Sequence, residues 1–157
     1  MILCGKAAGT HQILEISSII LSQRDIMSTL GNLNSGPNVV DAVTYHIYNL
    51  GPGGSKELFD KMQDPFFLSQ IAQTFKNEEE TVKDFGPWSS AWIGEAEGAF
   101  NSGGPESGTF VGSFWYLDQL GMASKFNHRA YCRQALIGGN YALLDTQTFI
   151  PNPDYYR

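Results

Sequence analysis

The sequence predicts an α/β fold with a parallel sheet, and three observations support that prediction. Three apolar segments rich in β-branched and aromatic residues cover residues 39–48, 91–96 and 130–137. Each of them runs into a Gly-rich loop, and a segment with helical periodicity separates each one from the next. Strands that alternate with helices are typical of parallel sheets, in which functional sites lie at the loops after the strands.

The strand over 39–48 follows a loop of turn-forming residues at 32–37 and is apolar on both faces, as buried parallel strands are. Before this loop, residues 13–30 carry apolar positions that suit a short helix only loosely. The strand over 91–96 is equally apolar except for one carboxylate near its end. The strand over 130–137 contains an Arg and a Gln.

Two helices are expected between these strands. Asp64 and Pro65 predict a helix start, with Asp64 as N-cap and Pro65 at the first helical position, and the periodic segment continues to about Gly86. The second helix covers about 110–121, where Phe110, Phe114 and Leu117 share one face.

Composition, charge and length argue against several classes of function. The chain has 157 residues, 42% of them apolar, and a net charge of −6. The negative charge and the lack of a basic run argue against binding to nucleic acid. No run of about 18 apolar residues predicts a membrane-spanning helix, and no basic region followed by an apolar run predicts a signal peptide. The length fits one domain but falls short of a complete eight-fold barrel, which needs at least about 200 residues.

Glu95 is the first candidate functional residue, because a carboxylate at the end of an apolar strand must be paired, desolvated or functional. The alternative is an ion pair with Arg133 on the next strand. His46 and Tyr48 alternate with their neighbours and therefore share one face, and the alternative for His46 is a core histidine with its hydrogen bonds satisfied. The acidic run 78–80 is expected to be a solvated helix face rather than a metal site.

The sequence lacks the motifs of several other kinds of functional site. The sequence lacks the Gly motifs that bind phosphate, the Walker lysine motif, the nucleophile elbow of hydrolases and the ligand spacing of zinc sites, so no metal or cofactor is predicted. Two cysteines do not make a disulfide framework, and Cys132 is expected to be a small buried apolar residue.

Several motifs resemble the heparanase-like endo-β-glucuronidases of glycoside hydrolase family 79, with the plant branch most similar. The motifs are VDAVTYHIYNLGPG at 40–53, WIGEA at 92–96, AFNSGGP at 99–105, FWYLDQLG at 114–121, YCRQALIGGNY at 131–141 and PNPDYY at 151–156. The resemblance runs over 36–157, and residues 1–35 form an unmatched N-terminal segment.

The resemblance implies a (β/α)8 TIM barrel, of which this chain holds roughly the last three β/α units. Residues 36–157 would then be the C-terminal part of the barrel. The family implies retaining hydrolysis of β-glucuronides, with a glycan or glycoside containing β-glucuronic acid as the partner and no cofactor. Full-length members are secreted, lysosomal or vacuolar, or membrane-associated, which implies peripheral membrane association without a transmembrane helix. The net charge of −6 favours a less charged glucuronide over a sulfated chain.

Carried over by motif, Glu95 would be the catalytic nucleophile at the end of the seventh barrel strand. Phe100 stands where a Tyr is common in the family. The substrate-binding residues implied by the same motifs are His46, Tyr48, Phe100, Asn101, Ser102, Gly103, Arg133, Gln134, Gly139, Asn140 and Tyr141.

A retaining glycosidase also needs an acid/base, which the family takes from an Asn-Glu pair at the end of the fourth barrel strand. The Asn-Glu dipeptide of this sequence, Asn77-Glu78, lies in a predicted helix and is rejected. With half of the catalytic pair missing, we expect this truncated chain to be inactive by itself. The alternatives are a non-catalytic fragment that binds a carbohydrate or a partner, and a truncated product without function.

Overall fold

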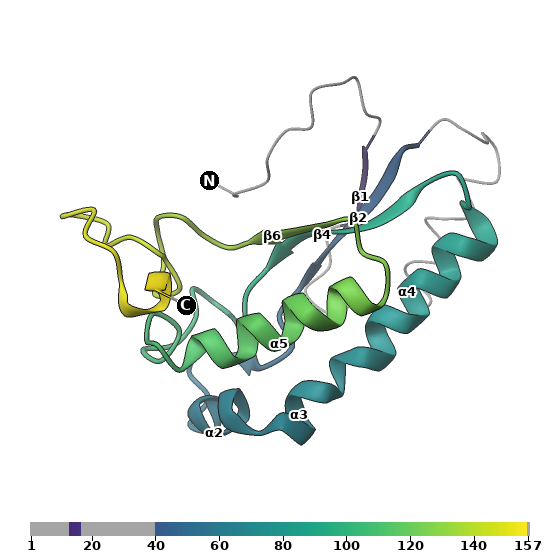
Figure 1. The fold of residues 1–157 in the computed structure, drawn as a ribbon. Coiled ribbons are helices and arrows are strands. Elements are labelled where there is room, and N and C mark those ends of the chain that lie inside the picture. The colour runs from purple at the N-terminus through teal and green to yellow at the C-terminus, as the bar shows by residue number, and fades with distance from the viewer. Residues whose placement is uncertain (1–12, 17–39, 157) are drawn as a thin grey trace.

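The computed structural model describes residues 13–16 and 40–156 of the chain (Figure 1). Along the sequence the elements are β1 (Ile13–Ile16), β2 (Ala42–Ile47), β3 (Gly51–Pro52), α2 (Leu58–Gln63), α3 (Pro65–Ser69), α4 (Ile71–Phe85), β4 (Ser90–Ala96), β5 (Ala99–Phe100), α5 (Gly112–Lys125), β6 (Ala130–Arg133) and the 3₁₀ helix η2 (Pro153–Tyr156). Strands alternate with helices from β2 onward, which confirms the expected α/β class.

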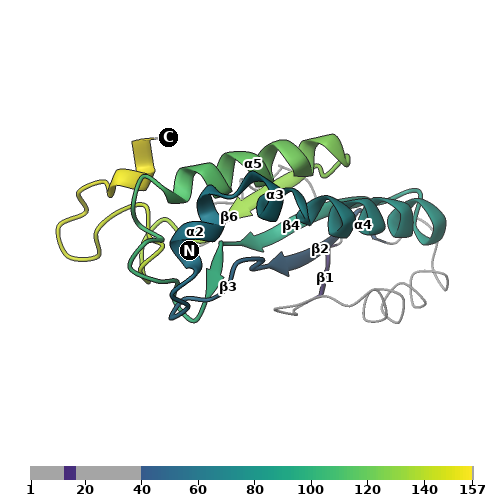
Figure 2. The ribbon, with the colours of Figure 1, turned by 90° about the horizontal axis from the view of Figure 1, so that it is seen from below.

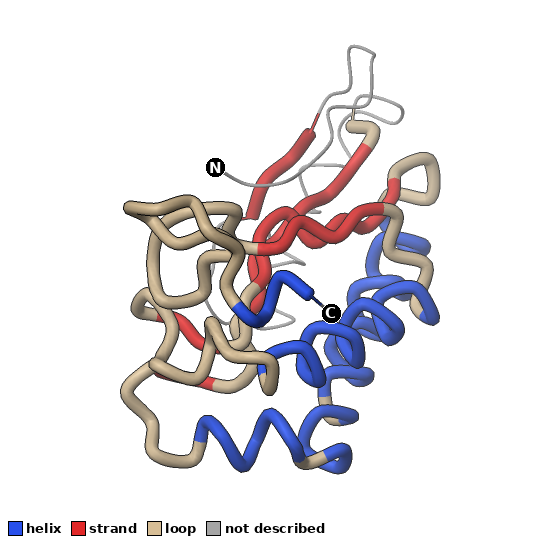
Figure 3. Tube along the Cα trace, turned by 60° about the vertical axis from the view of Figure 1, so that its left-hand side comes forward, coloured by secondary structure: helices blue, strands red, loops and turns tan. Residues whose placement is uncertain are grey.

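A four-stranded parallel sheet in the order β1-β2-β4-β6 is the centre of the fold. Helices α4 and α5 cover one face of this sheet, and β3 and β5 form a separate two-stranded parallel pair beyond the ends of β2 and β4 (Figure 2). The long loops after the strands gather on one side of the molecule (Figure 3). Because the strands are parallel, the residues that end β2, β4 and β6 meet at a single edge of the sheet.

Two apolar clusters hold these layers together. The first fills the space between the sheet and helices α4 and α5, and it includes Val43, Tyr45, Ile93 and Phe75. The second lies beneath α2, α3 and α5, and it consists of Leu50, Leu58, Met62, Leu68, Ala99 and Trp115. Trp115 is fully buried and donates its indole N–H to Asn49 Oδ1 at 2.7 Å, so the second cluster carries its own polar anchor.

The helix expected from Asp64 onward is correct at both ends but divided in the middle. The Asp64 carboxylate accepts a hydrogen bond from the Phe66 N–H at 2.9 Å, and α4 ends at Phe85, just before Gly86. Between them the Gln70 N–H bonds to the Phe67 carbonyl, three residues back, which tightens the chain and separates α3 from α4. The short helix α2 before Asp64 was not expected.

Three other expectations need correction. Residues 13–16, expected in a loose helix, form the edge strand β1, and the rest of that expected helix lies outside the described residues. Strand β6 ends at Arg133, earlier than residue 137. Cys132 is buried as expected but is disulfide-bonded.

The acidic run on α4 is also different from the prediction. Glu78 is 3% exposed and belongs to the interior, whereas Glu80 is exposed and forms an (i, i+4) ion pair with Lys76. An α-helix completes one turn in about 3.6 residues, so three successive glutamates point in different directions and cannot all lie on one solvated face.

The outer face of α5 is apolar. Phe114 and Leu117 lie on one side as predicted, whereas Phe110 precedes α5, which begins at Gly112 rather than at about 110; each of these three side chains is 54% exposed. Trp115 and Gln119, both fully buried, occupy the inner side of the helix instead. Within 13–16 and 40–156, no helix is both long and apolar enough to cross a membrane.

Candidate active site

The carboxyl ends of β2 and β4 bring Glu95 beside His46. The two strands pair Tyr45 with Ile93 and then His46 with Glu95, so β4 contains one extra residue at Gly94. A Cβ at position 94 would lie 1.9 Å from Thr44 Oγ1, so the close strand approach at this bulge requires glycine. The bulge changes the direction of the side chains that follow it, and this places Glu95 against the end of β2.

Glu95 has two polar neighbours from β2 and the loop after it. The Tyr48 hydroxyl donates a hydrogen bond to Glu95 Oε1, and His46 Nδ1 lies 3.7 Å from the same oxygen. The side chains of His46 and Glu95 are 18% and 17% exposed, which leaves the carboxylate accessible. As the alternation of the strand predicted, His46 and Tyr48 reach the same group.

The hydroxyl of Tyr48 is a hydrogen-bond donor throughout the ordinary pH range. Burial of the ring and the hydrogen bond to Glu95 raise its pKa well above the usual value for tyrosine. A neutral phenol can donate to a carboxylate, and a hydrogen bond to the charged form favours that form. Tyr48 therefore orients the Glu95 carboxylate through this hydrogen bond.

Two loops lie side by side next to this group. Asn101, Ser102 and Gly103 follow β5 with φ angles of 59°, 67° and 70°, a run in the left-handed region. The Asn140 N–H donates to the Ser102 carbonyl at 2.9 Å, and Asn140 Nδ2 donates to the Gly103 carbonyl at 3.4 Å. Left-handed non-glycine residues cluster at functional sites, where the surrounding structure holds them.

Tyr141 packs against both loops and explains their glycines. A Cβ on Gly103 would lie 2.9 Å from Tyr141 Cδ1, and a Cβ on Gly139 would lie 2.7 Å from Tyr141 Cε2. The Tyr141 hydroxyl accepts a hydrogen bond from Gln134 Nε2 at 3.3 Å. Tyr141 also contributes to the raised pKa of Tyr48, so these residues belong to one neighbourhood.

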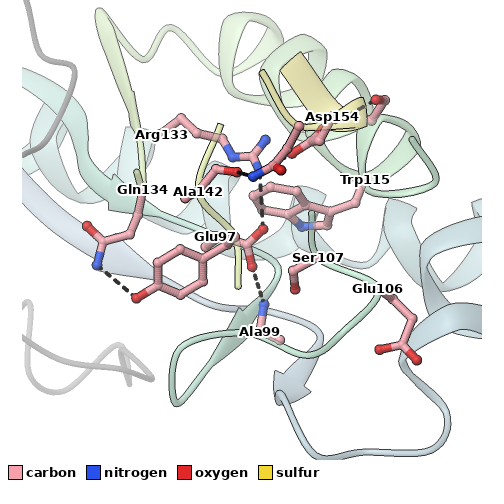
Figure 4. A network of polar contacts seen from close by, with 12 residues as sticks. Glu97, Ala99, Glu106, Ser107, Trp115, Arg133, Gln134, Ala142 and Asp154 are labelled. Atoms are coloured by element: carbon pink, nitrogen blue, oxygen red, sulfur yellow. Dashed lines mark hydrogen bonds and ion pairs between the residues drawn. The ribbon is translucent and has the colours of Figure 1, made fainter. Parts of the chain in front are cut away.

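Arg133 does not occupy the substrate-contacting position that was expected for it. It is 3% exposed, its Nη2 bonds to Asp154 Oδ2 and lies 3.4 Å from Glu97 Oε1, and its guanidinium stacks over Trp115 and Tyr116 (Figure 4). So placed, it has almost no surface to offer a ligand. The alternative ion pair between Glu95 and Arg133 is wrong, because Arg133 is paired with these two other carboxylates.

Sequence analysis missed Glu97 and Asp154. Glu97 is fully buried, accepts the Ala99 N–H at 2.9 Å through Oε2, and has its pKa raised to about 7 by burial against the opposite effect of Arg133. Asp154 is also fully buried and accepts from Ser113 Oγ at 3.3 Å. The available signal was a second carboxylate two residues beyond Glu95, on the same apolar stretch.

Phe100 is half-buried in β5, where it pairs with Pro52 of β3. In the sequence it stands between Glu95 and the left-handed loop, and its ring has no hydroxyl to contribute. In the parts of the chain that the structure describes, no group of three or more His, Cys, Asp or Glu residues could hold a metal ion.

Comparison with known proteins identifies the family. The sequence model described as "Glycosyl hydrolase family 79, N-terminal domain" matches residues 27–121. The chain belongs to glycosyl hydrolase family 79. The match starts before the boundary expected at residue 36, and the resemblance to the plant heparanase-like proteins is confirmed.

The relatives are much longer than this chain. Heparanase-like protein 2 of Arabidopsis thaliana is 59% identical over 123 residues, which are 78% of this chain and 23% of that protein. Baicalin-β-D-glucuronidase of Scutellaria baicalensis is 46% identical over 115 residues, 72% of this chain and 22% of that protein. Heparanase of Bos taurus is 34% identical over 158 aligned residues, which span 98% of this chain and 28% of that protein. The chain thus spans between a fifth and a third of these curated relatives.

Solved glycosidases share the fold. A 4-O-α-L-rhamnosyl-β-D-glucuronidase of Fusarium oxysporum superposes with a TM-score of 0.61 at 21% identity, covering 95% of this chain and 30% of that one. A family 44 xyloglucanase of Paenibacillus polymyxa gives a TM-score of 0.54 at 18% identity, covering 74% of this chain and 28% of that one. At these identities the likeness concerns the arrangement of strands and helices.

Proposed function

We propose that this chain is the part of a family 79 glycosidase that carries the nucleophile, and that Glu95 attacks β-linked glucuronic acid in a retaining mechanism. The observation that carries the proposal is the accessible Glu95 carboxylate, held by the Tyr48 hydroxyl and flanked by His46 at 3.7 Å. Two glucuronidases among the similar proteins support a glucuronide as substrate. The parallel sheet fits a segment of a (β/α)8 barrel with its site at the strand ends.

The proposed step uses one oxygen of Glu95 to bond to the anomeric carbon while the bond to the leaving group breaks. The hydroxyl of Tyr48 orients the carboxylate, and the backbone around Asn101 and Asn140 offers hydrogen-bonding groups to the sugar. The net charge of −6 favours a glucuronide with an uncharged leaving group over a polyanionic chain.

A retaining enzyme needs a second carboxyl group as acid/base, about 5–5.5 Å from the nucleophile. Glu78 is buried in α4, near Tyr45 and on the helix side of the sheet, which supports rejecting Asn77-Glu78 as the acid/base. Glu97 is committed to Arg133 and the Ala99 N–H. We therefore propose that the acid/base comes from protein outside this chain, and that the chain alone forms the glycosyl intermediate without turning over ordinary glucuronides.

β-D-Glucuronosyl fluoride tests this proposal, because fluoride leaves without a proton from a general acid. Intact-mass spectrometry of the purified chain should show the added mass of one glucuronosyl group, and peptide mapping should place it on Glu95. The intermediate should accumulate, since its hydrolysis needs the missing general base.

Two variants control the experiment. Glu95→Gln should abolish labelling, whereas Glu57→Gln should label normally, because Glu57 is 76% exposed and pairs with Lys61 on the surface. Absence of an adduct on a chain with a native near-ultraviolet circular dichroism spectrum would overturn the catalytic proposal. Glucuronic acid binding measured by calorimetry in that case would instead support the non-catalytic carbohydrate-binding alternative.

A further inference from the structure

Glu97 lies between the proposed nucleophile and a loop that is proposed to contact the sugar. It follows Glu95 by two residues, directly after the end of β4, and it precedes β5, which leads into the left-handed loop 101–103. Its side chain is fully buried. Because it has no surface with which to contact a substrate, Glu97 can act on the site only through the backbone on either side of it.

The two carboxylate oxygens of Glu97 face different partners (Figure 4). Oε2 accepts the Ala99 N–H at 2.9 Å, which holds the turn between β4 and β5. Oε1 lies 3.4 Å from Arg133 Nη2 at the end of β6. The carboxylate therefore joins the start of β5 to the strand on the other side of β4.

The backbone around Glu97 is held against the end of β2. The Glu97 N–H donates to the Ile47 carbonyl at 3.3 Å, and the Leu50 N–H donates to the Gly98 carbonyl at 2.8 Å. A Cβ at Gly98 would lie 2.6 Å from Leu50 Cδ1, so the chain packs closely here. The Glu97 side chain extends these constraints to Ala99 and, across the sheet, to β6.

The stability of the fold does not require the charge of Glu97. Burial raises its pKa to about 7, so folding disfavours the ionised form. Arg133 has a second carboxylate partner in Asp154, which is also fully buried. A buried acid whose charge opposes folding, two residues from a proposed nucleophile, indicates a role other than stability.

We propose that Glu97 is a positioning residue, which sets the alignment of Glu95 against the sugar at the loop 101–103. The inference rests on the proposed function, because it assigns to Glu97 the geometry of that reaction. Glu97 acts through the backbone of β4 and β5 and touches neither the sugar nor the reacting atoms. A misplacement of about 1 Å between reacting groups costs about a hundred-fold in rate, so small shifts of this segment are measurable.

Sugar binding depends on other contacts. The two loops that border the site are joined by hydrogen bonds from Asn140 to the carbonyls of Ser102 and Gly103. Glu97 takes part in neither bond. A change at Glu97 should therefore leave the proposed sugar-binding surface intact while moving it relative to Glu95. The expected signature is a slower attack at saturating substrate with little change in half-saturation.

Labelling of the full 157-residue chain by β-D-glucuronosyl fluoride at a series of concentrations tests the inference, with the adduct on Glu95 followed by mass spectrometry. Glu97→Gln keeps the shape of the side chain, but its amide places a donor where either Arg133 or the Ala99 N–H needs an acceptor. The labelling rate at saturation should fall about ten-fold or more, and the half-saturating concentration should change by less than about two-fold.

Glu97→Asp is a second variant, which keeps the charge but shortens the side chain by one methylene, so that the carboxylate no longer reaches both partners. It should slow the saturating rate in the same way. Leu68→Ala is the control for stability, because Leu68 is buried in the second apolar cluster and its truncation destabilises the fold without removing a contact of Glu97. All rates are expressed per folded chain, with the folded fraction measured by near-ultraviolet circular dichroism.

Labelling of Glu95 at the unmodified saturating rate in both Glu97 variants would overturn the inference and leave the proposed function in place. An equal loss of rate per folded chain in Leu68→Ala would also overturn it, in favour of a purely structural role. A raised half-saturating concentration at an unchanged saturating rate would overturn it in favour of a role in sugar binding. Absence of an adduct on the unmodified chain would overturn both proposals.

Discussion

Replacement of Glu78 by Gln should make the chain more resistant to unfolding at alkaline pH. Glu78 is 3% exposed on α4, and burial alone raises its pKa from the ordinary 4.5 to about 7. Its charge also raises the pKa of the buried Tyr45, which places it against the helix side of the sheet. The folded chain therefore favours the protonated acid, and ionisation of this group opposes folding.

The magnitude follows from proton linkage. Because the pKa in the folded state is above that in the unfolded state, the contribution to stability is fully present below about pH 4.5 and is lost as pH rises through about 7. At about 1.4 kcal/mol per pKa unit the total is about 3 kcal/mol, most of which falls between pH 5 and pH 8. Glutamine has nearly the same shape as the protonated acid and does not titrate, so Glu78→Gln keeps this contribution at both pH values.

Urea unfolding of both proteins at pH 5 and pH 8 measures the effect. The free energy of unfolding of Glu78→Gln relative to the unmodified chain should rise by roughly 2–3 kcal/mol between these pH values. Glu80→Gln is the control, since Glu80 is 58% exposed beside Lys76, and its relative stability should change by less than about 0.5 kcal/mol. A Glu78→Gln difference that is the same at both pH values would refute the assignment of a buried, uncompensated acid.

Three further outcomes follow from the site and the core. Tyr48→Phe removes the donor to Glu95 and should slow labelling by glucuronosyl fluoride about ten-fold or more, as followed by mass spectrometry. Gly94→Ala places a Cβ 1.9 Å from Thr44 Oγ1 and should lower the free energy of unfolding by roughly 1–3 kcal/mol, with partial recovery in the double variant with Thr44→Ala. Burial lowers the pKa of His128 to about 4. The neutral ring therefore stabilises the fold above pH 6.5, and this contribution is lost as pH falls toward 4. His128→Gln should reduce the loss of stability between these pH values, as measured by urea unfolding.

Sequence analysis predicted the elements that depend on local patterns. The strand around Glu95, the shared face of His46 and Tyr48, and the N-cap at Asp64 follow from alternation and capping rules within a few residues. The family motifs supplied the role proposed for Glu95. These predictions needed no knowledge of which strands are neighbours.

The partner of Arg133 depends on strand register, which local patterns do not determine. Strands β4 and β6 pair Ile93 with Tyr131, and an unbroken ladder would place Glu95 opposite Arg133. The irregularity between Ile93 and Ala96 instead brings Ala96 opposite Arg133. The shift takes Glu95 out of register with Arg133, and Glu97, which follows the end of β4, lies near the guanidinium instead.

The face that each helix buries also depends on features that local patterns do not show. Periodicity shows which residues share a face, but the neighbours of the helix decide which face is covered. On α5 the polar Gln119 is buried because its amide donates to Asn49 and its oxygen accepts from Tyr131, so the side with Phe114 and Leu117 remains outside. Glu78 is buried with α4 although it lies among charged residues in the sequence.

A buried network of ion pairs and hydrogen bonds around Arg133 holds the end of the strand that carries the proposed nucleophile. Glu97 lies two residues after Glu95, and Arg133 connects it to Asp154 of the 3₁₀ helix η2 near the end of the described chain. Asp154 is bonded in turn to Ser113 in the first turn of α5. Burial raises the pKa of Glu97 to about 7, and the nearby Asp154 carboxylate adds to this rise while Arg133 opposes it. The two acids that follow the bulge at Gly94 thus have different tasks: Glu95 stays accessible and bonded to a neutral phenol, whereas Glu97 connects β4 to β6 and η2.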